Sequence, residues 1–448
     1  MSAISPESEP RALSSARTEA VAAAMLARII PVLLFRFALD LAYVFYVAPA
    51  FTADPITPMR LNLSAERYVL SIALVVIATM IVPFTKRNLS GISYMAAMMF
   101  LYVPMTSMIG FNTQLPIEPT LITLFAIVVS LVFVNTPLVP LLPLARNGER
   151  RAILLSAACI TIFIGWSLYS GAAGNVTFDP DKMYDFRESN STLLDVGAWS
   201  YIGLWAEKIF NPLLFAIALY HRNKVMILLS LAIQVYFFAI TQHRIHLFAP
   251  VLVFMMYLLY SRRIELASIY LYSAIATVAL LGIVLLFNFD EAASVLLRRS
   301  LYVAPSVTID WISYFDGANK IFWTDRYLFG RPPTEWTGVD IPYFIGHEKF
   351  PDKPFAMSVG MVGAGYSQAG LWGVALYAAI LGTIINFLNR LIRRGIPVYI
   401  AAAILIGPIR TAWADSDLLT TLLSHGIVVG ILVLAVLGRL DRNQTQTR

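Results

Sequence analysis

The sequence has few charged residues and almost no cysteine. Only 13% of its 448 residues are charged, whereas 58% are hydrophobic. Soluble domains carry about 25% charged and about 45–50% apolar residues, so this composition excludes a soluble globular protein. The single cysteine, Cys159, lies inside an apolar run and has no second cysteine with which to form a disulfide in the chain.

The short motifs of common soluble enzymes are also missing. There is no P-loop, no GxSxG or HExxH, and no group of Cys and His at metal-ligand spacing. ATP-driven and zinc-dependent activities are therefore disfavoured, and we expect no cofactor and no metal site. The net charge of +6 does not point to nucleic acid, because the basic residues lie in short connections between apolar runs.

Long apolar runs are what the sequence does contain. Each is continuously apolar, as a membrane helix requires, whereas a strand of a membrane barrel would alternate. The sequence therefore predicts an all-α, polytopic transmembrane bundle of about twelve spans. The predicted spans are 28–50, 67–85, 92–110, 117–136, 152–170, 200–220, 224–241, 246–261, 266–288, 366–389, 396–411 and 418–438.

The short connections between these runs carry their basic residues mainly on alternate sides. Cytoplasmic termini would place eighteen of the 33 Lys and Arg in short inner connections and tails. These residues are Lys86, Arg87, Arg146, Arg150, Arg151, Arg222, Lys224, Arg262, Arg263, Arg390, Arg393 and Arg394, with Arg11, Arg17, Arg28, Arg439, Arg442 and Arg448 in the tails. The positive-inside rule then predicts that both termini are cytoplasmic.

This topology divides the chain into five parts. Residues 1–27 and 439–448 form cytoplasmic tails, and residues 28–438 form the bundle. Two long polar segments, 171–199 and 289–365, are predicted on the opposite side of the membrane. Within the second, the apolar spacing over 307–323 predicts a helix lying at the membrane surface.

An arginine at the outer boundary is the sharpest candidate for function. Arg244 follows His243 in a very short connection between two apolar runs, on the side where the positive-inside rule disfavours arginine. A guanidinium binds two phosphate oxygens at once, so Arg244 is expected to clamp a diphosphate. The alternative is an arginine that meets only lipid headgroups.

The large polar segment adds further candidates. Arg298 and Arg299, together with Arg331 near Gly330, are expected to contribute to the same clamp, unless they are only surface charges. His347 and Glu348 are candidate bases for deprotonating a sugar hydroxyl, because histidine titrates near neutral pH. The alternative for this pair is a solvated turn.

Charged and glycine-rich positions inside the spans have two interpretations each. Glu207 and Lys208 interrupt an apolar run. If they lie at membrane depth, they are functional or form a buried pair. The alternative is that they lie at the lipid headgroups and that the span starts after them. Arg36 and Asp40, four residues apart, favour a structural ion pair on one helix face. The glycines around Tyr366 favour close helix packing, with a phosphate-binding helix terminus as the alternative.

Three segments resemble the bacterial O-antigen polymerases (Wzy type), which belong with the O-antigen ligases to a class of lipid-linked sugar transferases. They are 239–254 with its basic residue before an apolar helix, 298–306 (RRSLYVAPS), and 365–374 (GYSQAGLWGV). The resemblance covers residues 190–440 by pattern, whereas residues 1–190 match only in hydropathy.

The resemblance implies a GT-C-like glycosyltransferase in the bacterial inner membrane, with its active site on the periplasmic side. The expected activity is transfer of a growing glycan from undecaprenyl diphosphate to a new lipid-linked repeat unit, without a metal. Arg244, Arg298, Arg299, Arg331, His243 and Tyr366 would bind the diphosphate substrate, and His347 or Glu348 would be the base. Membrane lipids and a chain-length regulator protein would be partners. An O-antigen ligase acting on lipid A-core, and a flippase or transporter of lipid-linked glycan, are the alternatives.

The topology can be tested by thiol labelling. Single cysteines at positions 185 and 340, in a chain with Cys159 replaced by serine, should react with a membrane-impermeant reagent in intact spheroplasts, because both positions are predicted to be periplasmic. A cysteine at position 223, in a predicted cytoplasmic connection, should react only after lysis. Labelling of 185 and 340 only after lysis would refute this orientation.

Overall fold

The prediction of an all-helical fold is confirmed by a computed structural model of the protein. It describes residues 8–53, 59–140, 143–145, 148–176, 183–243, 245–262, 264–287, 294–325, 334–351 and 355–439. Helices make up 79% of the structure, and no strand occurs in these ranges. Within the same ranges, Asn62 and Asn112 form an isolated β-bridge.

The helices follow the predicted apolar runs, and each of these runs contains a helical segment. In chain order the elements are α1 (Ser8–Ala42), η1 (Tyr43–Val47), α2 (Ala48–Phe51), α3 (Ala65–Ile81), α4 (Leu89–Ala97), η2 (Met98–Tyr102), α5 (Val103–Phe111), α6 (Glu118–Val134), α7 (Glu149–Tyr169), η3 (Ala172–Gly174), α8 (Met183–Leu194), α9 (Ala198–Trp205), η5 (Ala206–Phe210), α10 (Asn211–Tyr220), α11 (Lys224–Thr241), α12 (Ile245–Ser261), α13 (Leu266–Phe287), η6 (Ser294–Val303), α15 (Ala304–Gly317), α16 (Ile341–Lys349), α17 (Met361–Arg393), α18 (Val398–Ala414), α19 (Leu418–Leu423) and α20 (Ile427–Leu437).

Eight helical stretches in the described ranges are long and apolar enough to cross a membrane, so the chain is a membrane-embedded helical protein. They are Ala22–Phe51, Leu89–Phe111, Glu149–Tyr169, Ala198–Tyr220, Lys224–Thr241, Leu266–Phe287, Met361–Arg393 and Leu418–Leu437. Shorter apolar helices cover Glu118–Val134, Phe248–Ser261 and Val398–Ala414.

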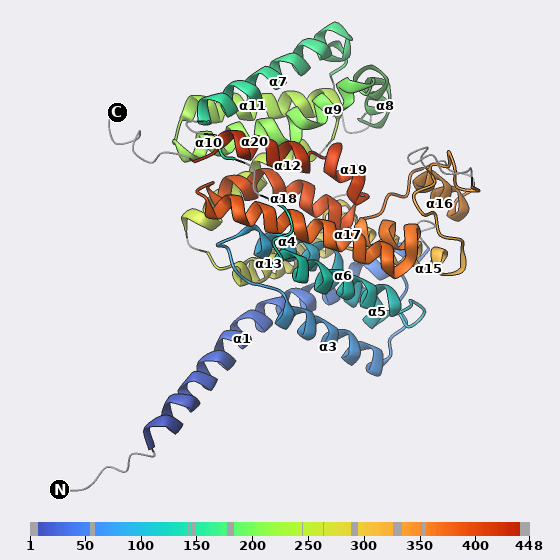
Figure 1. The fold of residues 1–448 in the computed structure, drawn as a ribbon. Coiled ribbons are helices and arrows are strands. Elements are labelled where there is room, and N and C mark those ends of the chain that lie inside the picture. The colour runs from blue at the N-terminus through green and yellow to red at the C-terminus, as the bar shows by residue number, and fades with distance from the viewer. Residues whose placement is uncertain are drawn as a thin grey trace, which may run out of the picture.

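The long helices form one bundle (Figure 1). α7 and α11 lie along one edge and α3 along the opposite edge, while α17 packs along α6 and α1 along α13. The N-terminal part of α1 projects away from the bundle. The short helices α8, α15, α16 and α19 gather at one end, on the right in Figure 1. The segments 171–199 and 289–365 thus contribute helices to the same end of the bundle.

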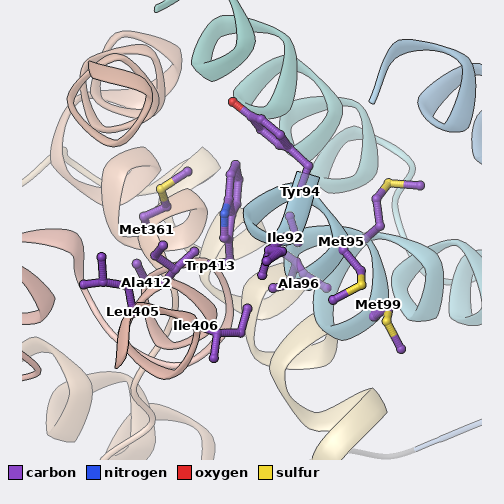
Figure 2. Close-up of a cluster of buried hydrophobic side chains, with 14 of the residues drawn as sticks. Ile92, Tyr94, Met95, Ala96, Met99, Met361, Leu405, Ile406, Ala412 and Trp413 are labelled. Carbon is purple, nitrogen blue, oxygen red and sulfur yellow. The ribbon is translucent and has the colours of Figure 1, made fainter. Parts of the chain in front are cut away.

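Bulky side chains fill the centre of the bundle, where α4, η2, α18 and the start of α17 meet (Figure 2). Trp413 is fully buried there, and its ring centroid lies 6.2 Å from that of Tyr94. A Cβ atom on Gly360 would lie only 2.1 Å from the Trp413 carbonyl oxygen, so α17 can begin this close to α18 only with glycine at that position.

Prolines explain four widened helical turns. The π-helical segments η1, η2, η5 and η6 each end two residues before a proline, namely Pro49, Pro104, Pro212 and Pro305. Proline has no N–H and its ring collides with the carbonyl four residues earlier. The preceding donor therefore reaches back five residues, as in the bonds from Val103 to Met98 and from Asn211 to Ala206.

α17 is two helices joined by a sharp break at Ala369 and Gly370, where Gly370 has a φ of 59°. The backbones of Gly365 and Gly373 meet across this break, because a Cβ on Gly373 would lie 2.0 Å from the Gly365 carbonyl oxygen. The predicted close packing of these glycines therefore occurs between two halves of one element. α17 covers the predicted span 366–389 and extends beyond it at both ends.

The segment 321–323 supplies hydrogen-bond donors to the backbone at this break. The Ile321 and Phe322 amides donate to the Ser367 and Gln368 carbonyls at 3.0 and 2.8 Å. The predicted surface helix over 307–323 was wrong in its extent: α15 ends at Gly317. It was also wrong in its position, because the aromatic face of α15 is buried against the protein, with Trp311 donating to the Met357 carbonyl.

The predicted ion pair between Arg36 and Asp40 is confirmed, and both residues are buried. The guanidinium and carboxylate have further partners on α3 and α5: Arg36 donates to Ser71 Oγ and the Thr106 carbonyl at 3.0 Å, and Asp40 accepts from Tyr68 at 2.9 Å and from Ser107 at 2.7 Å. These bonds compensate the removal of the two charges from water.

Replacing Arg36 by alanine should reduce the amount of folded protein, because it leaves the Asp40 carboxylate buried without its cation. Breaking one partner of a buried pair costs about 3–5 kcal/mol. The yield of monodisperse protein in detergent and the midpoint of thermal unfolding measure this loss. Arg28→Ala, an exposed arginine on the same helix, is the matched control. Equal yield and midpoint for both variants would contradict the structural role.

Candidate functional site

A cavity of about 380 Å³ opens at the end of the bundle where α8 lies. It is bounded by α7, α8, α9, η5 and the end of α11. Its volume falls within the range of about 300–1,000 Å³ that is usual for small-molecule sites.

Two helix faces supply most of the wall. α8 contributes Arg187, Asn190, Ser191 and Leu194, whose spacing of three and four residues places them on one side of a helix. α9 and η5 contribute Trp199, Ser200, Gly203, Leu204 and Glu207, again at helical spacing. Phe163, Asp195, Thr241 and His243 complete the lining.

Two carboxylates border this cavity. Glu207 is only 3% exposed and lies in the widened turn η5. Asp195 lies in the connection between α8 and α9. Partial desolvation, together with the nearby negative charge of Glu207, raises the pKa of Asp195 above its usual value, while Ser200 and Arg187 oppose this shift. Perturbed carboxyl groups of this kind are typical of functional sites.

His243 is the member of the predicted diphosphate site that lines the cavity. α11 ends at Thr241 because Gln242 adopts a left-handed backbone with a φ of 55°, and its amide donates to the Phe238 carbonyl at 2.8 Å. α12 begins at Ile245, so the connection is as short as predicted. His243 lines the cavity, whereas Arg244 lies outside the described residues.

Arg298 and Arg299, the arginines of the second polar segment that the structure describes, do not line this cavity. The guanidinium carbon of Arg298 lies 4.3 Å from the ring centroid of Phe51, so Arg298 packs against α2. Arg299 is exposed on η6. Arg331 lies outside the described residues. The structure therefore brings His243 into the cavity without Arg298 and Arg299.

The two candidate bases, His347 and Glu348, are exposed on α16 and likewise do not line the cavity. The next residue, Lys349, forms an ion pair with Asp310 of α15. Burial raises the pKa of Asp310, and the charge of Lys349 opposes that shift. This contact fixes α16 against α15 near the same end of the bundle.

Tyr366 occupies a separate polar cluster beside the break in α17. Its hydroxyl donates to Asp316 Oδ1 at 2.8 Å, and the Lys320 ammonium lies 4.6 Å from the Tyr366 ring centroid. Burial lowers the pKa of Lys320, while the charge of Asp316 opposes this shift. The cluster holds the loop that covers the break.

Sequence reasoning missed a polar cluster behind η5. Lys208 Nζ lies 2.8 Å from His425 Nδ1, and Arg410 forms an ion pair with Asp415. Of these four residues, only Lys208 was a candidate from the sequence. Arg410, in an otherwise apolar span, was the available signal, because a charge at that depth needs a partner.

Sequence reasoning also missed the wall formed by α8. Residues 187, 190, 191 and 194 fall in a segment that looked like a polar loop, although their spacing is helical. Trp199 and Glu207 are eight residues apart, which puts both on one face of a helix. These two spacings are the sequence signals from which the cavity wall could have been predicted.

The raised pKa of Asp195 gives a stability prediction with a definite sign. The folded state holds this proton more tightly than the unfolded state. The cost of folding with an ionised Asp195 is therefore absent below about pH 3.8, grows as pH rises toward the folded pKa and is complete above it. Asp195→Asn should therefore raise the free energy of unfolding near neutral pH, by on the order of 1 kcal/mol or less because the group is exposed, and raise the thermal midpoint with it.

Thermal unfolding in detergent at neutral and acidic pH measures this effect. Asp340→Asn, an exposed aspartate outside the cavity lining, is the matched control and should not change the midpoint. A lower midpoint for Asp195→Asn at neutral pH would mean that the carboxylate makes a net stabilising contact, contrary to the prediction.

No family model, curated protein or solved structure matches this chain. The lining residues themselves therefore indicate the chemistry of the cavity. Cationic, acidic and aromatic groups meet there in a membrane-embedded protein, at the end of the bundle that carries both polar segments.

Proposed function

We propose that this protein is a membrane-embedded glycosyltransferase that moves a glycan from undecaprenyl diphosphate to a second lipid-linked sugar, as O-antigen polymerases do. The observation that carries the proposal is the position of His243. It lines a cavity with Arg187 and two carboxylates, and Arg244 is the next residue in the chain. Such a site combines a cation for a diphosphate with proton acceptors for a hydroxyl.

The proposed topology is about twelve spans with both termini in the cytoplasm of a bacterial cell. The cavity would then open on the periplasmic side of the inner membrane. Nucleotide sugars do not reach that side, so a lipid-linked glycan is the suitable donor. Membrane lipids, and a chain-length regulator protein, are the partners that go with this function.

In the proposed reaction, a hydroxyl oxygen of the acceptor attacks the first sugar carbon of the donor glycan. The bond from that carbon to the diphosphate oxygen breaks, and undecaprenyl diphosphate leaves with the electron pair. The hydroxyl proton passes to a carboxylate. No redox change or nucleotide is involved, and arginine neutralises the leaving group in place of a metal ion.

Asp195 and Glu207 are the preferred proton acceptors, because they border the same cavity as His243. The raised pKa of Asp195 makes its carboxylate a stronger base than that of an ordinary aspartate. His347 and Glu348 remain candidates only if α16 moves toward the cavity when substrate binds. Arg187 adds positive charge from α8, and Arg298, Arg299 and Arg331 would act on a more distant part of the substrate.

The products that accumulate without the protein test the function. Loss of a polymerase leaves a single repeat unit on lipid A-core, whereas loss of a flippase leaves none. Loss of an O-antigen ligase leaves polymer on undecaprenyl diphosphate. Separation of lipid A-core and lipid-linked glycans from a deletion strain distinguishes the three activities. A normal polymer ladder in the deletion strain would exclude the proposal.

Arg244→Ala should abolish polymerisation while the protein remains in the membrane. A hydrogen bond to a charged group contributes about 1.5–3 kcal/mol, so losing two would slow the reaction by about two to four orders of magnitude. Arg244→Lys should restore activity only in part, because an ammonium keeps the charge but loses the two-pronged geometry. The length distribution of the glycan in complemented deletion cells is the measurement.

Arg60→Ala is the matched control, since Arg60 is an exposed arginine outside the cavity lining. It should give a normal ladder. If Arg244→Ala also polymerises normally at the wild-type expression level, Arg244 contacts only lipid headgroups and the clamp proposal fails.

A further inference from the structure

One wall of the cavity carries a rigid aromatic surface. The rings of Trp166 on α7 and Trp199 on α9 stack with centroids 4.5 Å apart and an interplanar angle of 1°. Trp199 lines the cavity, whereas Trp166 does not. Trp166 thus supports one side of the Trp199 ring from a long membrane helix, and the plane of Trp199 is fixed without any ligand.

A polar group in the wall has an unused acceptor. Asn190 is only 1% exposed, and its Nδ2 donates to the Asn175 and Ile240 carbonyls at 2.9 and 2.8 Å. These two bonds fix the orientation of the amide. Its Oδ1 has no hydrogen-bond partner in the described part of the chain. A buried acceptor in this state is unfavourable, and a hydroxyl donor from a ligand would relieve it.

We propose that this cavity is a carbohydrate subsite in which one sugar ring stacks on Trp199. A sugar ring has an apolar C–H face, which suits a flat indole, and an edge of hydroxyl groups, which suits planar polar side chains. Arg187, Asn190 and Asp195 provide such groups around the same cavity, and Ser200 adds a hydroxyl. A volume of about 380 Å³ is near the lower end for ligand sites, which favours one sugar residue over a longer chain.

The inference rests on the proposed function only in the identity of the sugar, which would be the acceptor ring of a lipid-linked repeat unit. The carboxylates Asp195 and Glu207 border the same cavity, so a ring held on Trp199 would present its hydroxyl groups to them. Trp199 is then a positioning residue for the acceptor, and the diphosphate of the donor would lie toward His243.

The test is direct binding of simple sugars to the full chain. The probes are methyl glycosides of a hexose, an N-acetylhexosamine and a 6-deoxyhexose. Their binding to the protein in nanodiscs is measured by saturation-transfer NMR. At least one glycoside should bind the wild type. Trp199→Ala should weaken that binding about tenfold, since a loss of about 1.4 kcal/mol in stacking and burial corresponds to a factor of ten.

Trp372→Ala is the matched control, because Trp372 is 84% exposed on α17 and does not line the cavity. It should bind the glycoside as the wild type does. Ser200→Phe provides a second variant that fills the cavity and leaves the Trp166–Trp199 stack in place. Ser200→Phe should abolish binding, and it decides between the outcomes if Trp199→Ala does not fold.

The outcomes separate the subsite from the proposed function. Binding by the wild type that is lost in Trp199→Ala or Ser200→Phe supports the subsite, even if deletion of the gene leaves the cellular glycans unchanged. No binding of any of the three glycosides by the wild type would overturn the subsite. Binding that persists in both Trp199→Ala and Ser200→Phe would overturn it as well.

Discussion

Hydrocarbon offers no hydrogen-bond partner to a peptide group, and this constraint shapes every irregular part of the bundle. Where a proline removes a donor, the preceding turn widens so that the last N–H still reaches a carbonyl, as at Pro104 and Pro212. Where α17 breaks at Gly370, the amides of Ile321 and Phe322 donate to the carbonyls that the break exposes. The buried charges of α1 obey the same rule, because polar groups of α3 and α5 surround them.

The candidate site lies where this constraint relaxes. α8 and the start of α9 belong to a polar segment at the end of the bundle, so charged and amide side chains can be accommodated there without a full set of protein partners. The widened turn η5 places Glu207 at the cavity, and the adjacent Lys208 contacts His425 on the other side. Acidic and cationic groups thus occupy adjacent positions of one helix.

Much of the fold follows from the sequence, because long apolar runs leave a chain in a bilayer few alternatives to helices. The Arg36–Asp40 ion pair was equally predictable from the sequence, because four-residue spacing puts both residues on one helix face. The break in α17 was not, because a glycine-rich run is compatible with either a straight or a broken helix. The cavity was only partly foreseen: Glu207 and His243 were candidates, but their meeting with Trp199 and Arg187 depends on the packing of α8 between distant elements.

The partners of α1 also impose an order on membrane insertion. Arg36 finds its hydrogen-bond partners on α3 and α5, within 70 residues of itself. Leu39, one turn away, accepts a hydrogen bond from Tyr302, which is 263 residues further along the chain. Because synthesis proceeds from the N-terminus, the first charged pair is sheltered by its nearest neighbours long before α13 and η6 exist. The early helices can therefore shelter the charged pair before the second half of the protein packs against them.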